Sequence, residues 1–347
     1  MKTYDNLFEI VCSFEHLLRS FYLCRKGKTY RIYALEFEAN LEENLFELQE
    51  ELRTGMWEPQ GYTTFYVYDP KKRLINAPTF RDRIVHRAVH DVIEPIWERI
   101  FIYDSYACRK GKGTHKGVDR LTKFLRSYPP KQKVYCFKAD IESYFASVDH
   151  EILFKIIKRK IVDKELLSVI WKIIDSYHEE GKLGVGIPLG NLTSQLFANI
   201  VLNELDYFIK HELRVKHYIR YMDDFVMLHP DKKQLWAWRD EIAKFLKKLK
   251  LQLHPKKQIV FPASKGIDFL GYIVFRDHRR VRRRNVHRFY QRLKKIANGT
   301  FDKDPEQSIM SWMGYTIHAD AYGLNKSIAK KYPILEIGLK KFYPDTK

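Results

Sequence analysis

The spacing of apolar residues along the chain predicts helices first and extended segments later. Residues 7–24 and 35–53 are predicted to be helical, and in the second stretch apolar side chains recur at intervals of mostly three or four. From Gly61 the pattern changes to alternation in YTTFYVYD and resumes as LINAP after the basic turn PKKR, which predicts a β-hairpin. A helix is predicted at about 81–97, followed by the Gly-rich basic loop YACRKGKGTHKGVDRL, which enters a further helix.

The segment 134–261 has the most informative pattern. VYCFKAD predicts a strand, helices follow within 150–177 and after the loop GIPLGN, HYIRYMDDFVMLH predicts two strands, and a helix precedes the strand material LQLH and QIVF. With the helical insertion 160–185 set aside, the order is β-α-β-β-α-β, the ferredoxin-like plan, which makes strand 135–140 and hairpin 218–228 neighbours. GIDFLGYIVF predicts another strand pair, and the basic stretch HRRVRRRNVHR leads into helices that continue to the end.

The charge of the chain indicates a polyanionic partner. Lys and Arg number 62 against 43 Asp and Glu, a formal net charge of +19, which favours nucleic acid or an anionic membrane surface. No window offers the ~18 or more continuous apolar residues of a membrane span, and the first residues lack a signal-peptide pattern. We therefore expect nucleic acid as partner, no membrane, and a cytoplasmic location, where the four scattered cysteines would be free thiols.

Two adjacent carboxylates, Asp223 and Asp224, interrupt the paired apolar strands of HYIRYMDDFVMLH. An unpaired ionised carboxylate in a low-dielectric setting costs several kcal/mol, and two side by side also repel each other. Three arrangements could stabilise them: a solvent-exposed turn, salt bridges for which Arg220 is a possible partner, or a hard divalent cation with oxygen ligands. On these two residues alone, the exposed turn is favoured.

A third carboxylate changes this balance. Asp140 ends the strand VYCFKAD, which the ferredoxin-like plan sets beside the hairpin of Asp223 and Asp224. Three converging carboxylates can hold two Mg²⁺ ions ~3.5–4 Å apart, the arrangement that promotes attack of a hydroxyl on a phosphate. Because adjacent strand residues point to opposite faces, Asp140 and Asp223 are assigned as bridging ligands and Asp224 as an outer contributor. With the basic charge, this predicts a nucleotidyl transferase.

The motifs around these aspartates resemble those of a known enzyme family. YMDD, preceded by FKADIESYF and GIPLGNLTSQLFANIVLNELD and followed by GIDFLGY, resembles the reverse transcriptases. PTFRDRIVHRAVHDVIEPIWE and SYACRKGKGTHKG are similar to the fingers blocks of group II intron-like enzymes. The resemblance implies an α+β right-hand polymerase with a ferredoxin-like palm. Its expected parts are a helical N-terminal extension at 1–60, fingers and palm at 61–276 (fingers about 61–133 and 160–185), and a basic helical thumb at 277–347.

One departure from the common motif indicates a branch of the family. Most reverse transcriptases carry Gln before the glycine and Pro after the serine, but IPLGNLTSQ has Leu189 and Gln195 there. This departure, YACRKGKGTHKG and SWMGYTIHADAYGL resemble the reverse transcriptases of diversity-generating retroelements. The resemblance implies error-prone, adenine-mutagenic cDNA made from a template-repeat RNA with a primer, dNTPs and an oligomeric accessory variability protein in a ribonucleoprotein. An antiphage-defence or other group II intron-like reverse transcriptase, and a non-catalytic nucleic-acid-binding scaffold, stay open.

The resemblance also places candidate residues around the nucleotide. Phe145 matches an aromatic steric gate against the 2′-hydroxyl, although a plain core aromatic is the alternative and the neighbouring Tyr144 could be confused with it. Lys71 and Arg73 lie on the hairpin that would fold over the triphosphate, where Arg suits bidentate phosphate contact, unless they form only a basic surface turn. Lys257 matches a lysine near the leaving pyrophosphate, a general-acid candidate, or else belongs to a solvated charge pair.

The loop of Leu189, Gly190 and Gln195 is expected to contact the nucleotide. A Gln at Leu189 would hydrogen-bond near the sugar and the templating pair, and losing such a contact forfeits ~1–3 kcal/mol of discrimination. The hypothesis is therefore a low-fidelity polymerase. The alternative is that Leu189 only packs the loop.

Further residues are candidates for contact with nucleic acid. Arg109 and Lys110 of the Gly-rich loop are expected to touch the template or its backbone, and Gly271 of GIDFLGY is expected in a primer grip, with a plain core strand as the alternative. The basic stretch could track a duplex backbone with salt-dependent affinity, or it could be a solvated linker. The candidate arginines among its six are Arg279, Arg280, Arg282, Arg283 and Arg284.

Overall fold

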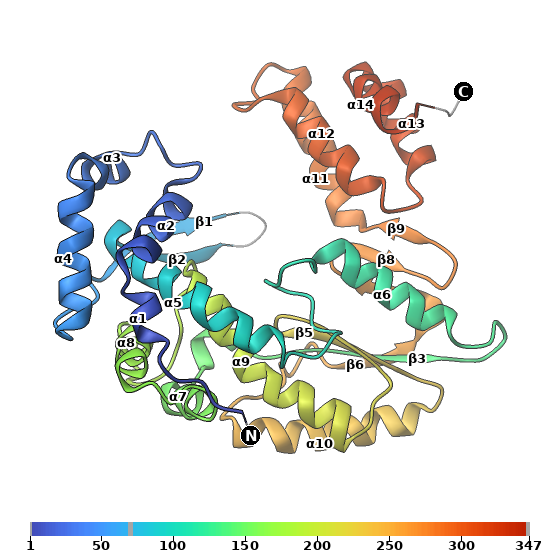
Figure 1. Ribbon diagram of the computed structural model, residues 1–347. Coiled ribbons are helices and arrows are strands. Elements are labelled where there is room, and N and C mark those ends of the chain that lie inside the picture. The colour runs from blue at the N-terminus through green and yellow to red at the C-terminus, as the bar shows by residue number, and fades with distance from the viewer. Residues whose placement is uncertain (1, 69–71, 345–347) are drawn as a thin grey trace.

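The computed structural model describes residues 2–68 and 72–344, and its N-terminal helices pack beside one long helix, α5 (Figure 1). The two predicted N-terminal helices exist, but each is divided. The Ser13 side chain accepts a hydrogen bond from the His16 amide and begins α2, while Asn40, at φ −125°, separates α3 from α4. The bounds are α1 Phe8–Val11, α2 Phe14–Arg25, α3 Ile32–Ala39, α4 Leu41–Arg53 and α5 Phe80–Glu98.

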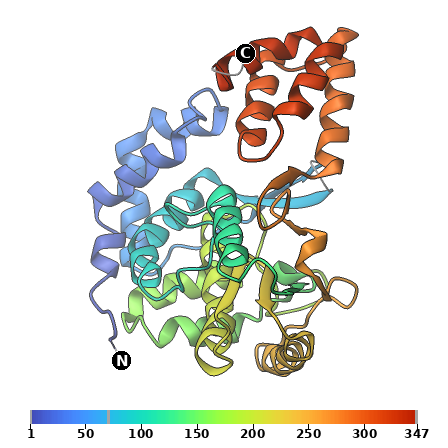
Figure 2. The same ribbon diagram turned by 90° about the vertical axis from the view of Figure 1, so that its right-hand side faces the viewer.

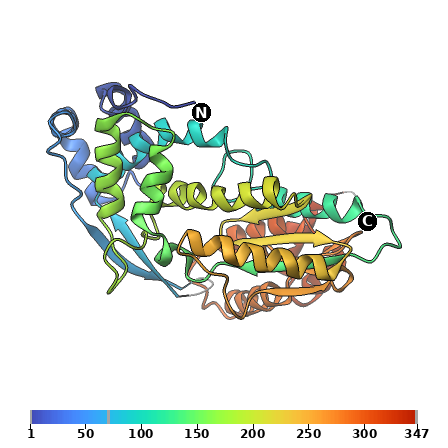
Figure 3. The same ribbon diagram turned by 90° about the horizontal axis from the view of Figure 1, so that it is seen from below.

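The central sheet, which we call the palm sheet, has four antiparallel strands in the spatial order β4-β5-β3-β6. This order confirms the predicted ferredoxin-like plan. Helices α9 and α10 lie side by side across one face (Figure 3), and α6 lies over the other face (Figure 1). The bounds are β3 Tyr135–Asp140, β4 His217–Tyr221, β5 Asp224–His229, β6 Ile259–Pro262, α6 Thr114–Arg126, α9 Leu192–Tyr207 and α10 Lys232–Lys248.

Two apolar cores, one on each face of the palm sheet, explain why its central strands are apolar throughout. Phe137, Tyr218 and Phe225 pack on the side of α9 and α10. Cys136 and Val226 pack on the side of α6. Because both faces are covered, β4 and the interior of β5 are buried without alternation, as in sheets with helices on both sides.

The predicted fingers hairpin is confirmed, and the helical insertion follows β3. Strands β1 and β2 pair antiparallel with Tyr62 opposite Pro78, and most of β1 is exposed. Helices α7 and α8 begin at capping aspartates, Asp149 and Asp163, whose side chains accept backbone amide hydrogens. The bounds are β1 Tyr62–Val67, β2 Arg73–Pro78, α7 His150–Lys158 and α8 Lys164–Asp175.

The C-terminal helices, which we call the thumb helices, rise from the palm at the far end from the N-terminal helices (Figures 1 and 2). They have their own core, in which the rings of Phe289 and Trp312 stack 4.1 Å apart. No helix in the described ranges is long and apolar enough to cross a membrane. The bounds are β7 Ile267–Phe269, β8 Tyr272–Val274, β9 Arg279–Val281, α11 Arg283–Ala297, α12 Pro305–Thr316, α13 Tyr322–Lys331 and α14 Glu336–Phe342.

One secondary-structure prediction for the C-terminal half is wrong, and one of the two alternatives left open for the basic stretch is excluded. The stretch 251–254 forms no strand: it runs past the end of β3 and pairs only through the isolated bridge between Leu253 and Ile141. Its next amide, that of His254, donates to the Asp140 carbonyl at 2.8 Å, beyond the ladder of the sheet. The basic stretch is not a linker, because 279–281 adds strand β9 to β8 and the helix begins only afterwards.

A buried ion pair anchors the β4–β5 hairpin to helix α9. The Arg220 guanidinium bonds the Asp206 carboxylate at 2.6 Å, and both side chains are 0% exposed. Tyr218 also donates to Asp206, at 2.7 Å, and Arg220 donates to the Asn199 side chain and the Met222 carbonyl at 3.1 and 3.0 Å. The alternative in which Arg220 neutralises the two hairpin aspartates is therefore wrong.

We expect Asp206→Asn to lower the free energy of unfolding by about 3–5 kcal/mol, because it leaves the buried Arg220 charge without a counterion. Urea unfolding followed by circular dichroism measures the change. Glu241→Gln is the matched control: its exposed ion pair with Lys244 is screened by solvent and should change the free energy of unfolding little. Equal effects of the two variants would contradict the anchoring role of Asp206.

Candidate active site

The palm sheet brings the three predicted aspartates to one end of its central strands. Asp140 is the last residue of β3 and lies directly opposite Asp224, the first residue of β5. Asp223 lies in the two-residue turn between β4 and β5, after Met222, whose φ of 54° is left-handed. A bulky residue rarely adopts that conformation, and such strain persists only where the surroundings enforce it.

Two lysines balance the negative charge of this cluster. The Lys257 ammonium forms an ion pair with the Asp140 carboxylate, and Lys138 lies 3.2 Å from Asp224. Burial, then the hydrogen bond and charge of Asp140, raise the pKa of Asp223 to about 7. Burial raises the pKa of Asp224 to about 6, although Lys138 acts in the opposite direction. Close carboxylates in a buried setting hold protons unless a cation compensates them.

The arrangement fits a hard divalent cation. The Oδ1 atom of Asp224 is buried and has no hydrogen-bond partner within the described ranges, so an acceptor is left without a donor. Carboxylate oxygens are the ligands that Mg²⁺ prefers. Asp140, Asp223 and Asp224 are therefore the residues that could hold such an ion.

Of the two aromatic residues after Asp140, one belongs to the core and the other is only half-buried. Tyr144 is 2% exposed and its hydroxyl donates to the Ala198 carbonyl at 2.6 Å, so it is the core aromatic. Phe145 is half-buried and meets Tyr144 edge-on at 5.8 Å between ring centroids. Of the two rings, Phe145 is therefore the one available to a nucleotide.

The loop of Leu189 joins the fingers hairpin to the segment of Phe145. The Ile187 amide donates to the Phe145 carbonyl at 2.8 Å, and the Asn76 amide of β2 donates to the Leu189 carbonyl at 2.9 Å. Gly190 has a φ of 121°, and a Cβ there would lie 2.8 Å from an Ile75 methyl group, so this approach requires glycine.

The remaining nucleotide candidates lie apart from this contact. Gln195 is half-buried in the first turn of α9, and Arg73 is exposed at the start of β2. Lys71 lies outside the described residues.

Comparison with known proteins decides the family. Residues 68–274 match the family described as reverse transcriptase (RNA-dependent DNA polymerase). The chain belongs to the reverse transcriptase family. It is 30% identical over 288 residues to protein YkfC of Escherichia coli (strain K12), covering 72% of this chain and 74% of YkfC. It is 24% identical over 332 residues to the group II intron-encoded protein LtrA of Lactococcus lactis subsp. cremoris, covering 75% of this chain and 54% of LtrA.

A solved structure supports the fold assignment of this reverse transcriptase. Apo telomerase from Candida tropicalis, truncated from its C-terminal domain, superposes with a TM-score of 0.51 at 16% sequence identity, covering 64% of this chain and 55% of that one. The right-hand polymerase fold is therefore confirmed. So is the prediction of an RNA-directed DNA polymerase with group II intron-like relatives, a family that generally depends on Mg²⁺.

Several arginines that were predicted to touch nucleic acid form ion pairs within the reverse transcriptase. Arg109 is 5% exposed, forms an ion pair with Glu98 at 2.7 Å and donates to two backbone carbonyls, so no guanidinium edge is left for a template. Arg279 forms an ion pair with Asp119 of α6 at 2.7 Å. Arg282 likewise bonds Asp268.

Other predicted nucleic-acid residues divide between free and occupied. Lys110 reaches Glu94 at 2.8 Å but stays 79% exposed. The Gly271 carbonyl accepts hydrogen bonds from the Tyr315 hydroxyl and the Arg282 amide, which ties the turn between β7 and β8 to the thumb helices. Three arginines stay exposed on the thumb side, namely Arg280, Arg283 and Arg284.

Lys138 was not predicted from the sequence as a residue of the active site. It lies two residues before Asp140 on the same strand and contacts both the Asp224 carboxylate and the Asp268 carbonyl. A lysine inside the apolar strand VYCFKAD was the available signal, since residues two apart on a strand share a face.

We expect Asp223→Asn to raise the Tm of the metal-free protein by roughly 2–5 °C at pH 8, because it removes a buried negative charge. The folded-state pKa of Asp223, about 7, lies above the usual value near 4. The folded wild-type protein therefore loses stability as pH rises through 7, where Asp223 ionises. The rise in Tm caused by the variant should shrink toward pH 4.

Thermal unfolding in chelator at several pH values measures this change. Asp240→Asn, at a half-exposed aspartate on α10, is the control and should leave Tm nearly unchanged. A lower Tm for Asp223→Asn at pH 8 would contradict the charge argument.

Proposed function

We propose that this reverse transcriptase extends a primer 3′-hydroxyl with dNTPs on an RNA template, with Asp140, Asp223 and Asp224 as ligands of two Mg²⁺ ions. The observation that carries this proposal is the cross-strand pair of Asp140 and Asp224 with Asp223 at the adjacent turn. When bound, the ions would activate the hydroxyl and offset charge on the triphosphate.

The proposal gives the surrounding side chains distinct roles. Lys257, which contacts Asp140, would donate a proton to the leaving pyrophosphate. Phe145 would exclude a 2′-hydroxyl, with Leu189, Gly190 and Gln195 forming the wall beside the base pair. Arg73 and Lys71 would bind the triphosphate from the fingers hairpin.

We further propose that the exposed thumb arginines Arg280, Arg283 and Arg284 bind the duplex backbone. Their exposure leaves them free to contact phosphates. We also propose that the chain divides into an N-terminal extension at 1–60, fingers and palm at 61–276, and a thumb at 277–347.

Leu189 supports a narrower proposal, that the enzyme serves a diversity-generating retroelement. Its backbone carbonyl is bonded to β2, so its side chain is held beside the fingers hairpin, where an aliphatic group offers no hydrogen bond to a nucleotide. We propose adenine-mutagenic cDNA synthesis in the cytoplasm from a template-repeat RNA, together with an oligomeric accessory variability protein.

We expect Asp223→Ala to abolish dNTP incorporation on a primed RNA template with Mg²⁺, because the variant loses a metal ligand. Primer extension by the purified protein measures this loss, and Asp240→Ala is the control that should retain activity. Incorporation by Asp223→Ala at the wild-type rate would refute the catalytic assignment. If the wild-type protein is inactive alone, adding its template RNA and accessory protein distinguishes a missing partner from a dead scaffold.

We expect Leu189→Gln to lower errors at template adenines by roughly tenfold, because a restored hydrogen bond adds discrimination on the order of 1–2 kcal/mol. Sequencing of cDNA products measures the error rate. Leu183→Gln is the matched control, since Leu183 is 88% exposed in the same loop. Accurate wild-type products would favour an antiphage-defence or other branch. Unchanged errors in Leu189→Gln would show that Leu189 does not set fidelity.

A further inference from the structure

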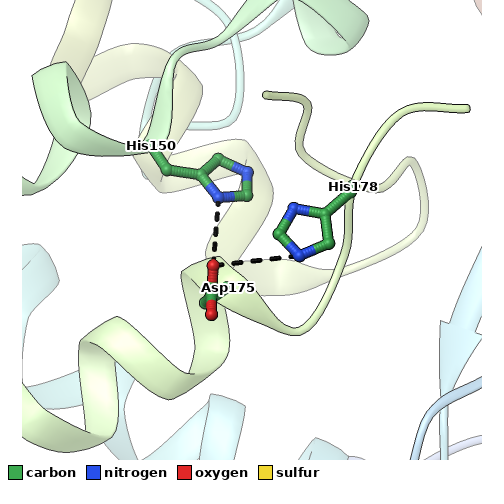
Figure 4. A group of neighbouring side chains, drawn as sticks. All are labelled: His150, Asp175 and His178. Carbon is green, nitrogen blue, oxygen red and sulfur yellow. Dashed lines mark ion pairs between the residues drawn. The ribbon is translucent and has the colours of Figure 1, made fainter. Parts of the chain in front are cut away.

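A cluster of two histidines and an aspartate lies outside the active site. His150 begins α7, Asp175 ends α8, and His178 follows in the next loop. Both rings point at the Asp175 carboxylate (Figure 4): His150 Nδ1 and His178 Nε2 lie 3.7 and 3.8 Å from the same Oδ1 atom. These separations are too long for hydrogen bonds, so ordinary pairing does not account for the convergence.

The His150 ring has an unsatisfied nitrogen. Its Nε2 donates to the Gly186 carbonyl at 2.7 Å, which fixes the proton of the neutral ring there and leaves a lone pair on Nδ1. His150 is 0% exposed, and Nδ1 has no hydrogen-bond partner within the described parts of the chain. The buried lone pair thus faces a carboxylate oxygen, and a cation between them would satisfy both.

We propose that His150, Asp175 and His178 bind a first-row transition-metal ion of the zinc type. Imidazole nitrogen and carboxylate oxygen are zinc ligands, with bonds of about 2.0–2.2 Å that set neighbouring ligand atoms about 3.3 Å apart in a tetrahedron. The observed 3.7 and 3.8 Å exceed this by only a few tenths of an ångström. The Gly186 carbonyl also orients His150 as backbone carbonyls orient metal-binding histidines.

The third ligand, His178, must exchange a hydrogen bond to bind the ion. The Gly184 amide donates to His178 Nδ1 at 3.0 Å, so the proton of the neutral ring lies on Nε2. A metal ion at Nε2 requires the other neutral tautomer, in which the proton has moved from Nε2 to Nδ1, so the ring gives up the bond from the Gly184 amide. Asp175 is 48% exposed, which leaves the fourth position open to water.

The proposed metal site is bonded to the segment that leads to Leu189. The His150 amide donates to the Gly184 carbonyl at 3.0 Å, and the Gly186 amide donates to the Val148 carbonyl at 2.8 Å. The next residue, Ile187, bonds the Phe145 carbonyl. An ion joining α7, α8 and this loop would fix the segment that leads to Leu189, so its role is structural.

Metal binding to the full chain tests the proposal. Chelator-treated protein receives one equivalent of Co²⁺ in excess Mg²⁺, which occupies sites made only of carboxylates. We expect visible absorption bands of tetrahedral cobalt, and one Zn²⁺ per chain after replacement and gel filtration. His178→Ala and Asp175→Asn should weaken binding at least about tenfold, and Zn²⁺ should raise the Tm of the wild type but not of His178→Ala.

The control variant is His90→Ala, from the other described group of nearby ligand atoms, His90, Asp91 and Glu94. It should leave cobalt binding unchanged. Both test variants replace partly exposed side chains, so folding is expected to survive, and circular dichroism verifies it. Absence of bound metal in folded wild type, or loss in His90→Ala but not in His178→Ala, overturns the proposal. These measurements do not depend on polymerase activity.

Discussion

The ion pair between Arg220 and Asp206 is the constraint on which the active site depends. Arg220 exchanges backbone hydrogen bonds with the segment Asp104–Tyr106 while its side chain bonds α9 and the turn at Met222. A shift of β4 by one residue would move this charge to the opposite face, away from the buried Asp206 carboxylate, at a cost of several kcal/mol. The pair therefore fixes the register of β4, which sets Tyr221 opposite Asp224 at the start of β5.

Part of the positive charge in this basic chain pairs with carboxylates of the protein itself. Arg279 and Arg282 join β9 and the start of α11 to Asp119 and Asp268, so the strand that leads into the thumb helices is held to the palm side by ion pairs. The positive charge that is not used in such ion pairs lies on exposed side chains. A nucleic-acid footprint is therefore better judged from unpaired arginines than from the net charge.

The sequence predicted the elements whose signals are local or topological. Alternation identified the fingers hairpin, and the ferredoxin-like order correctly placed Asp140 beside the hairpin of Asp223 and Asp224. Residue pairing could not be read in the same way. Arg109 and Arg280 look equally basic in the sequence, yet Arg109 pairs with the Glu98 carboxylate, because Glu98 ends the preceding helix, whereas Arg280 stays exposed.

The candidate metal-binding aspartates lie at the ends of the palm strands and not in their interiors. The interiors of β3, β4 and β5 are covered on both faces, so an added charge there would need a partner as exacting as Asp206. At the strand ends, Asp140 pairs with Lys257 and Asp224 pairs with Lys138, and both carboxylates are partly exposed. The strained φ of Met222 is tolerated because the Arg220 side chain donates a hydrogen bond to the Met222 carbonyl. Stability supplied by the buried network thus permits a charged, strained site at its edge.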